Sequence, residues 1–359
     1  MKIIFYLPSL SNGGAERVQA VLAQGFAARG YHVVVVVDRE ASESRHLLGP
    51  QVRLVLLGGG HLRDVLALRT LIRKERPDAI ISALGYCNLK ATLAATMAGA
   101  SGRLVLTWHG YAVSEPQRLS QIGYRLVPLL SRTAAATVAV SDGLKQDLVA
   151  RLRSSPGRTS RIYNPVSVGG VPAGLDVESL TARDPTVLAV GRLLPDKGFV
   201  TLLRAFAQVR MPAARLVILG EGPQRAELAA EVERLGLSGR VDMPGHVVEP
   251  WGYFARARCF VSASRMESFG LVLVEALAHG LPVVSTDCGA TSEVLGNGRF
   301  GRLVPVGDAA AIANAIDDQL AAPGEPLPRQ ARAAVFSTDA ALDEYERLIG
   351  TFAAAGSLP

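Results

Sequence analysis

The chain has 359 residues, of which 49% are hydrophobic and 19% are charged. This balance provides enough apolar material for folded cores and excludes disordered, collagen-like and coiled-coil proteins. At roughly 150 residues per domain, the length predicts two domains. The net charge of +6 is divided unevenly, because residues 1–165 hold 21 Lys and Arg against 10 Asp and Glu, whereas residues 166–359 hold 17 against 22. We therefore expect the first half to face an anionic partner.

Nucleic acid is not the partner that we expect, because the basic residues are not interleaved with aromatic ones and no recognition motif occurs. The three cysteines lie far apart, without the spacing of a disulfide framework or a zinc site. The first apolar run, residues 3–10, ends without a small-residue cleavage site, so we interpret it as a buried strand rather than a signal peptide. No apolar stretch reaches the roughly 18 residues that span a bilayer. The sequence therefore predicts a cytoplasmic protein whose contact with a membrane would be peripheral.

In the first 165 residues, short apolar runs alternate with longer helical patterns, which is typical of a parallel sheet. Strands are expected at 3–7, 33–37, 52–57, 79–82, 104–107 and 137–140, and helices at 15–29, 62–75, 88–98 and 143–152. This series predicts one doubly wound domain over residues 1–165.

The composition then changes, and residues 166–185 are rich in Gly and Pro with little hydrophobic periodicity. This segment is predicted to be a linker. A second series follows, with strands at 186–190, 215–219, 241–243, 259–262 and 282–285 and helices at 199–209, 224–235, 271–278 and 309–320. The predicted fold is therefore α/β, with two Rossmann-like, doubly wound parallel-sheet domains that face each other across a cleft. The second domain is expected at residues 186–337.

A glycine-containing loop follows the first strand of each predicted domain. The loop with Gly13 and Gly14 opens a helix, where backbone N–H groups can approach an anion, although a tight strand-to-helix turn is an equal explanation. It lacks the Gly-x-Gly-x-x-Gly of a dinucleotide site. In the second domain, Arg192 and Lys197 lie in the loop Gly191–Gly198, at the sheet edge where such folds bind ligands. Two cations there suit a diphosphate, while a solvated loop lysine is the alternative for Lys197.

A third segment, residues 262–271, leaves a strand and runs into a helix that carries Glu275. The backbone amides of Phe269, Gly270 and Leu271 would point at an anion there. Glu267 in the turn would lie near a reacting centre, and Glu275 would accept hydrogen bonds from paired hydroxyl groups. Glu275 could instead be a helix residue without a binding role. Its neighbours are apolar, however, so burying its carboxylate requires a partner.

His109 closes a predicted strand of the first domain, at the edge that would face the second domain. A general acid or base, or a ligand for a substrate oxygen, is one interpretation, and a structural histidine is the other. The remaining histidines show no metal-ligand spacing, so no metal site is predicted.

Together these segments form an ordered set that resembles family 4 of the retaining glycosyltransferases, which have the GT-B fold. The set consists of Gly13–Arg17, Trp108–Gly110, Ile162–Pro165, Gly191-Arg192 with Lys197-Gly198, Leu219–Pro223, Glu267–Leu271 with Glu275, Gly280–Val284, and Gly289 with Glu293. The resemblance covers nearly the whole chain.

The resemblance implies that a nucleotide-sugar donor lies on the second domain, with a catalytic part for His109, Glu267, Arg192 and Lys197. Arg192 and Lys197 would bind its diphosphate, Glu275 the ribose, and Glu267, Ser268 and the amides of Phe269, Gly270 and Leu271 the sugar and phosphate. Gly14 would approach the phosphates, His109 the donor sugar, and the backbone of His246 and Val247 the base. A C-terminal helix, about 338–352, would pack back onto the first domain.

Transfer in this family retains the anomeric configuration and needs no metal, so no cofactor is expected beyond the donor substrate itself. The cations and the helix N-terminus would neutralise the departing diphosphate. Where the family usually has an aromatic residue two positions before a glycine, this chain has Met243-Pro244-Gly245, with Trp251 in the same loop. The sequence therefore leaves the identity of the nucleotide base undecided, and we expect a UDP-sugar rather than a GDP-sugar.

Two basic amphipathic stretches, residues 61–76 and 117–132, are compatible with contact to an anionic inner leaflet, or else with core-facing helices that have a solvated basic face. We expect a glycan acceptor, such as a polyprenyl-diphosphate-linked saccharide, and transfer of a hexosyl or N-acetylhexosaminyl group in bacterial surface polysaccharide synthesis. The alternatives are another GT-B enzyme, such as a nucleotide-sugar epimerase or a phosphorylase, and a non-catalytic sugar-binding protein.

Overall fold

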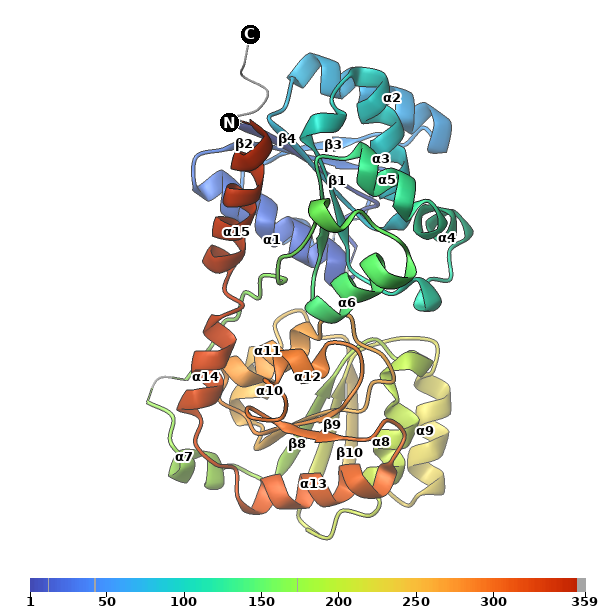
Figure 1. The fold of residues 1–359 in the computed structure, drawn as a ribbon. Helices are drawn as coiled ribbons and strands as arrows, with labels where there is room; N and C mark the ends of the chain where they lie inside the picture. The colour runs from blue at the N-terminus through green and yellow to red at the C-terminus, as the bar shows by residue number, and fades with distance from the viewer. Residues whose placement is uncertain (12, 42, 173, 354–359) are drawn as a thin grey trace. The chain divides into compact units, whose positions relative to one another are not determined.

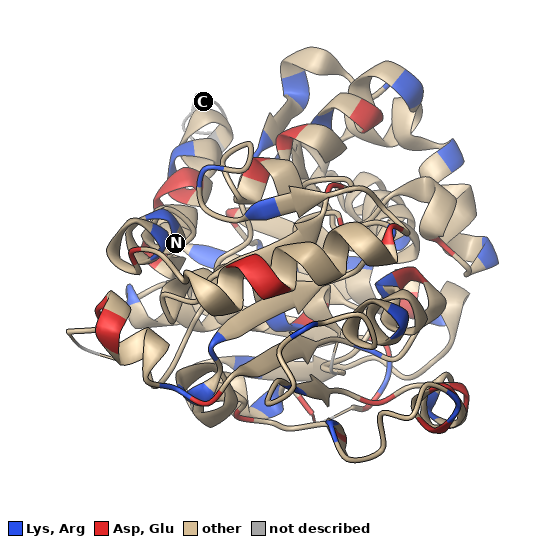
Figure 2. Cartoon of the chain, turned by 90° about the horizontal axis from the view of Figure 1, so that it is seen from below, with Lys and Arg blue, Asp and Glu red and all other residues tan. Residues whose placement is uncertain are grey.

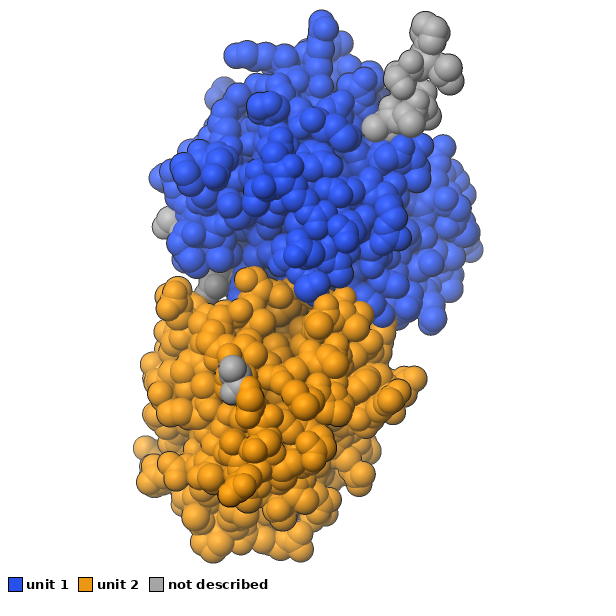
Figure 3. Space-filling model, turned by 90° about the vertical axis from the view of Figure 1, so that its left-hand side faces the viewer, with its two compact units in different colours: residues 1–165, 337–359 blue, residues 166–336 orange. Residues whose placement is uncertain are grey.

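The computed structural model describes residues 1–353 except 12, 42 and 173. They form two compact units, and each has its own sheet and core (Figure 1). Unit 1 contains residues 1–165 and the segment from residue 337 onward, and unit 2 contains residues 166–336 (Figure 3).

Unit 1 is built on a sheet of parallel strands in the order β3-β2-β1-β4-β5-β6-β7. The strands are β1 (Lys2–Leu7), β2 (His32–Val37), β3 (Arg53–Leu56), β4 (Ala79–Ala83), β5 (Leu104–Trp108), β6 (Ala136–Ala139) and β7 (Thr159–Arg161). The central strands are apolar along their length because helices cover both faces of the sheet. The strand order reverses between β1 and β4, where Ile3 lies opposite both Val33 and Ala79.

The helices of unit 1 follow the right-handed crossovers that parallel strands require. They are α1 (Gly14–Ala28), α2 (His61–Glu75), α3 (Gly85–Ala98), α4 (Arg118–Arg125), α5 (Val127–Thr133), α6 (Asp142–Gln146) and α15 (Thr338–Ala353). Helices α2, α3, α4 and α5 pack together as one layer, and α15 packs on α1 (Figure 1).

Helix α15 is joined to α1 by apolar and ionic contacts. Leu342 is buried and faces Gly25, a position of α1 where an added Cβ would collide with the leucine. The guanidinium of Arg29 donates to Asp343 at 2.6 Å and to Asp339 at 3.0 Å. The last segment of the chain thus belongs to the unit that the first segment begins.

Unit 2 repeats the architecture with a parallel sheet in the order β10-β9-β8-β11-β12-β13. Its strands are β8 (Thr186–Val190), β9 (Arg215–Leu219), β10 (Val241–Gly245), β11 (Cys259–Ser262), β12 (Val283–Thr286) and β13 (Arg302–Val304). Its helices are α7 (Val177–Thr181), α8 (Phe199–Phe206), α9 (Arg225–Arg234), α10 (Trp251–Arg256), α11 (Leu271–Ala278), α12 (Thr291–Val294), α13 (Ala309–Ala321) and α14 (Leu327–Ala334). The two sheets confirm the predicted pair of doubly wound α/β domains.

Two segments differ from the sequence-based expectation. Residues 166–185, expected as a linker, belong to unit 2 and carry the short helix α7, which begins where the Asp176 carboxylate accepts from the amide of Ser179 at 2.8 Å. The amphipathic stretch 117–132 is divided into α4 and α5, because Leu126 ends the first helix and Pro128 occupies the first turn of the second.

Candidate functional site

The crevice of unit 2 lies where its strand order reverses, between β8 and β11. These two strands pair directly, with Cys259 opposite Val187, but their following connections leave in opposite directions. In open parallel sheets this arrangement leaves a binding crevice at the carboxyl ends of the strands. The loop after β8 carries Arg192 and Lys197, and the loop after β11 carries Glu267.

An ion pair joins these two loops. The Lys197 Nζ lies 2.6 Å from Glu267 Oε1, and the Ser264 hydroxyl donates to the same oxygen at 2.9 Å. Burial alone would lower the pKa of Lys197, but the charge and hydrogen bond of Glu267 outweigh burial, so the pKa is raised. Lys197 is therefore a fixed cation at physiological pH.

Close backbone contact fixes the geometry of this pair. Gly198 has a φ of +67°, and a Cβ there would collide with the carbonyl oxygen of Ala263 in the β11 loop. In the same region the amide of Arg265 donates to the carbonyl of Asp196 at 2.7 Å. The two loops therefore interlock, and this contact holds the backbone on both sides of the Lys197–Glu267 pair.

Arg192 differs from Lys197 in its surroundings. Its side chain is exposed, and it forms no ion pair with any residue of the described part of the chain. An exposed guanidinium can offer its planar fork to an incoming phosphate. The loop thus offers one cation held in an ion pair, Lys197, and one exposed cation, Arg192.

Helix α11 begins beside the same loop. Gly270 precedes it with a φ of +88° and offers no side chain to cap the first turn. The first amides of a helix lack intrahelical acceptors and carry positive partial charge, so this end can bind an anionic group. Glu275, one turn further on, is only 2% exposed, among the apolar side chains of α11.

The loop that follows β10 carries His246, which is exposed, and Val247, which is half-buried. Its start is held to the neighbouring strand because the amide of Gly220 donates to the carbonyl of Gly245 at 2.8 Å. Arg225 adds a bond to the carbonyl of Met243 at 2.9 Å. These bonds place the loop at the same sheet edge as the loops of Lys197 and Gly270.

Unit 1 carries the remaining predicted residues at the carboxyl edge of its own sheet. His109 follows β5, and its Nε2 lies 3.1 Å from Thr107 Oγ1 and 3.2 Å from Gln19 Nε2. Burial lowers the pKa of His109 to about 4, so the imidazole is neutral at pH 7. Gly14 begins α1, directly after β1 and its loop. The chain therefore brings together Arg192, Lys197, Glu267 and the start of α11 within unit 2, and His109 and Gly14 along one edge within unit 1.

Sequence reasoning missed the polar residues that support Glu267. Ser264 bonds its carboxylate, and Thr286 at the end of β12 donates to the carbonyl of Ser264. The Ser-x-x-Glu spacing within the β11 loop could have indicated the first contact. Thr286 has no such signal, because it comes from a strand that only the fold brings alongside.

Two doubly wound units with this crevice define the class of GT-B glycosyltransferases, and the comparisons agree. Residues 12–169 match the model "Glycosyltransferase Family 4" and residues 176–335 the model "Glycosyl transferases group 1". The structure resembles that of Anabaena Alr3699/HepE in complex with UDP and glucose, with a TM-score of 0.82, 23% identity and coverage of 98% of this chain and 100% of the other.

Curated relatives extend over similar lengths. One is a Campylobacter jejuni N-acetylgalactosamine-N,N'-diacetylbacillosaminyl-diphospho-undecaprenol 4-alpha-N-acetylgalactosaminyltransferase, 30% identical over 85% of this chain and 86% of the relative. Another is the Rhizobium meliloti lipopolysaccharide core biosynthesis glycosyltransferase LpsE, 28% identical over 95% of this chain and 96% of the relative. The chain belongs to glycosyltransferase family 4.

Proposed function

We propose that this glycosyltransferase moves a hexosyl or N-acetylhexosaminyl group from a UDP-sugar to a lipid-linked saccharide, with retention of anomeric configuration. The donor half of this proposal rests mainly on the ion pair of Lys197 and Glu267, which lies in the loop that leads into the start of α11. A diphosphate is bound well by cations together with the amides of a helix N-terminus, which supports a donor site in this crevice.

Each residue of the crevice has a distinct part in this proposal. Lys197 and Arg192 bind the diphosphate, with the α11 amides on its terminal phosphate. Charge that develops on the departing diphosphate then meets donors already in place, so the transition state is stabilised without reorganisation and without a metal. The buried carboxylate of Glu275 accepts hydrogen bonds from the ribose hydroxyls, and the amide groups around His246 and Val247 bind the base.

Glu267 and His109 act on the sugar. Glu267 is held by Lys197 and Ser264, and it accepts hydrogen bonds from sugar hydroxyls near the anomeric carbon. His109 is neutral, so its ring can bond a sugar hydroxyl without placing a second cation beside an oxocarbenium-like centre. Gly14 leaves the start of α1 open to the phosphates, since a glycine has no side chain in the way. UDP as the nucleotide is supported by a related fold solved with UDP and with UDP-glucose.

Support for a lipid-linked acceptor comes from the relatives and from the surface of unit 1. The Campylobacter relative's name specifies an undecaprenyl-diphosphate substrate. None of the described helices combines the length and apolarity needed to cross a bilayer. Yet the layer of α2 to α5 exposes large apolar side chains, namely Leu62, Leu66, Leu93, Met97, Ile122 and Leu129.

The same helices carry basic side chains, and Figure 2 marks the Lys and Arg positions in blue. These are Arg63, Arg69, Arg73, Lys74, Arg118, Arg125 and Arg132, whereas Val65, Leu68 and Ile72 of α2 face the core. Apolar side chains that can insert between lipids, with cations beside them, favour peripheral contact with an anionic leaflet. Contact of this kind would bring a polyprenyl-linked acceptor to a protein that remains in the cytoplasm.

Product analysis tests this function. The protein is incubated with a radiolabelled UDP-sugar, with and without membranes that contain polyprenyl-diphosphate saccharides, and the products are separated. We expect label in the lipid fraction, with the anomeric configuration of the donor, only when the membranes are present. A new nucleotide sugar formed from donor alone would indicate an epimerase and contradict the proposal.

A further inference from the structure

A chain of buried polar groups adjoins the ring of His109 in unit 1. The ring Nε2 lies 3.1 Å from the hydroxyl oxygen of Thr107, and that hydroxyl donates to the carbonyl of Ser82 at 2.9 Å. Thr107 and Ser82 are fully buried, and Gln19 of α1, which also approaches the ring, is 1% exposed. Buried polar groups are almost always hydrogen-bonded, so each proton in this chain should have a defined acceptor.

A count of these protons decides which ring nitrogen carries one. The single proton of the Thr107 hydroxyl is donated to Ser82, so toward the ring its oxygen offers only lone pairs. The neutral imidazole of His109 has one N–H, either at Nδ1 or at Nε2. With the proton at Nδ1, lone pairs of Nε2 and of the Thr107 oxygen would face each other at 3.1 Å, an unfavourable contact in a buried place. With the proton at Nε2, the ring donates to Thr107, which donates to Ser82.

The amide group of Gln19 is the second neighbour of this ring nitrogen, at 3.2 Å. With the amide nitrogen toward the ring, Gln19 Oε1 is buried and has no hydrogen-bond partner among the described residues. Rotation about the last side-chain bond exchanges the amide oxygen and nitrogen, and Oε1 then accepts from the ring Nε2–H. The amide also lies 3.4 Å from the Thr107 oxygen, which is longer than a usual hydrogen bond. Gln19 therefore also favours a proton at Nε2.

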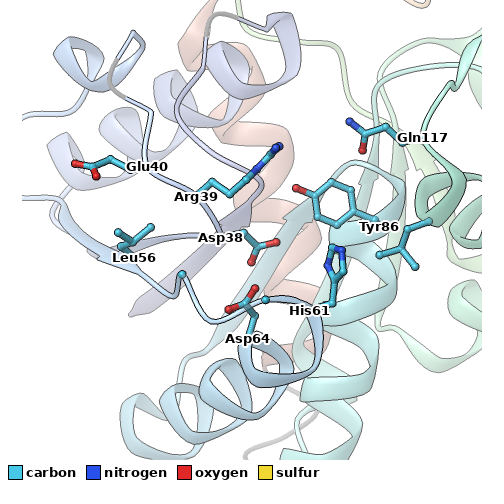
Figure 4. A pocket seen from close by; sticks show the side chains of 11 residues that line it. Asp38, Arg39, Glu40, Leu56, His61, Asp64, Tyr86 and Gln117 are labelled. Carbon is cyan, nitrogen blue, oxygen red and sulfur yellow. The ribbon is translucent and has the colours of Figure 1, made fainter.

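The other side of Thr107 is fixed by helix α3. The side-chain amide of Asn88 donates to the Thr107 carbonyl at 3.0 Å. Helix α3 is itself anchored, because Lys90 Nζ lies 2.7 Å from Asp38 and 2.9 Å from Asp64. Figure 4 shows these two carboxylates facing one another. The hydroxyl of Thr107 is thus held in place beside the ring.

We propose that Thr107 and Gln19 are positioning residues that hold His109 in its Nε2–H form, so that Nδ1 can only accept a hydrogen bond. The inference rests on the proposed function, which takes the ring to contact the donor sugar. A nitrogen that only accepts requires a free hydroxyl on the sugar, whereas an Nδ1–H would equally bond an ether or acyl oxygen. Thr107 and Gln19 thereby select a donor sugar with a free hydroxyl at the carbon that His109 contacts.

Nuclear magnetic resonance of the protein with ¹⁵N-labelled histidine tests the ring directly. The two ring nitrogens are chemically distinct, and each shows a different shift when it is protonated. His109 is assigned by the signal that His109→Gln lacks. The variants are Thr107→Val, Gln19→Met and both together, with Thr107→Ser to restore the hydroxyl. The matched control is Thr137→Val, because Thr137 is a buried threonine of the adjacent strand β6 whose hydroxyl has no partner among the described residues.

We expect a protonated Nε2 at pH 7 in the unaltered protein, in Thr107→Ser and in Thr137→Val. The double variant lacks both acceptors, so a signal from protonated Nδ1 should appear in it. A protonated Nδ1 in the unaltered protein would overturn the proposal without the use of any variant. A protonated Nε2 that persists in the double variant would overturn it as well, because Thr107 and Gln19 would then have no influence on the ring.

Transfer assays with fluorinated donors test the consequence for the substrate. UDP-sugars are used in which fluorine, which cannot donate a hydrogen bond, replaces one sugar hydroxyl at a time. At the carbon that His109 contacts, the unaltered protein and Thr137→Val should prefer the hydroxyl donor to the fluorinated one about tenfold or more in kcat/KM. The double variant should lose most of this preference at that carbon, while its affinity for UDP itself is unchanged.

An equal preference in the double variant and the control at every carbon would contradict the selection of a free hydroxyl. Absence of transfer by the unaltered protein, together with an Nε2–H signal that the double variant loses, would instead contradict the proposed function and leave the control of the ring by Thr107 and Gln19 intact. The two claims therefore fail separately.

Discussion

At the residue scale, the protonation of His109 makes the free energy of unfolding depend on pH. Its pKa falls from 6.5 to about 4 because burial disfavours the charged ring. Between these values the unfolded chain binds more protons than the folded chain, so stability is fully present above pH 6.5 and is lost as the pH falls toward 4. The same neutral form of His109 is the one that the proposed function uses.

The prediction concerns the free energy of unfolding at pH 7 and pH 5. His109 should account for a loss of about 2 kcal/mol between these two values. In His109→Gln this part of the loss should be absent, because glutamine does not titrate. Chemical denaturation of both proteins at both pH values measures the difference. An identical pH dependence in the two proteins would show that the ring is already charged or exposed in the folded state.

The sequence predicted the positions of candidate site residues that lie in loops after strands. It did not predict the contacts of residues that are buried between elements. Lys197 and Glu267 could be placed because each follows an apolar strand of a parallel sheet, and such strands end at one edge. Lys90 showed no signal, since a lysine in a predicted helix is ordinarily exposed. Only the fold reveals that α3 directs it between Asp38 and Asp64.

At the scale of elements, the interlocked loops of unit 2 depend on Gly198. An alanine there would need a left-handed backbone conformation and would collide with the carbonyl of Ala263. We predict that Gly198→Ala displaces Lys197 and weakens binding of a nucleoside diphosphate at least tenfold, a loss of about 1.4 kcal/mol. Isothermal titration with UDP measures it.

Gly239→Ala is the matched control, because nothing lies near the Cβ that it adds in the same unit. Its affinity for UDP should equal that of the unaltered protein. If Gly198→Ala bound UDP as tightly as this control, the loop contact would have no part in forming the donor site.

We predict that helix α15 is stabilised more by its apolar contact with α1 than by its ion pairs. Leu342 is 2% exposed, so Leu342→Ala should destabilise unit 1 by about 2–5 kcal/mol. Arg29→Ala removes ion pairs to Asp339, Asp343 and Glu346, which are 86%, 58% and 31% exposed, and should cost less than about 1 kcal/mol. Urea unfolding of the two variants compares them. A larger cost for Arg29→Ala would reverse this ranking.

The pattern of the sequence predicted long elements better than short ones. Apolar runs of five or six residues, as in β1 and β2, are unambiguous when both faces of a strand are buried. The edge strands β7 and β13 have three residues each and carry polar residues, so periodicity does not detect them. The stretch at 166–185 resembles a linker in composition, but its contacts within unit 2 are non-local and only the fold displays them.

At the scale of the whole molecule, we expect the protein to bind anionic vesicles through the exposed apolar and basic side chains of α2 to α5. We expect sedimentation with vesicles that contain phosphatidylglycerol at low salt, and release at high salt, because the attraction between basic side chains and lipid headgroups is screened. The variant Leu62→Asp/Leu66→Asp should bind more weakly, because a carboxylate does not insert among the acyl chains and is repelled by the anionic headgroups.

Leu327→Asp serves as its control, because Leu327 is 64% exposed on unit 2, outside the helix layer. Equal sedimentation of the two variants would exclude α2 from the membrane contact. Failure of the unaltered protein to sediment at low salt would remove the peripheral contact altogether.

The central claim is that unit 2 binds a nucleotide-sugar donor through Lys197 and Glu275, and a melting-temperature screen tests it most directly. The protein and the variants Lys197→Ala and Glu275→Ala are heated with UDP, GDP, ADP and their common sugars, with and without EDTA, with Lys145→Ala as control. A ligand that binds the native state raises the melting temperature by mass action. We predict that UDP and its sugars raise it equally with and without EDTA in the unaltered protein and the control, and that both site variants lose the shift. A shift that persists in Lys197→Ala and Glu275→Ala, or no shift with any of these nucleotides, would contradict the account.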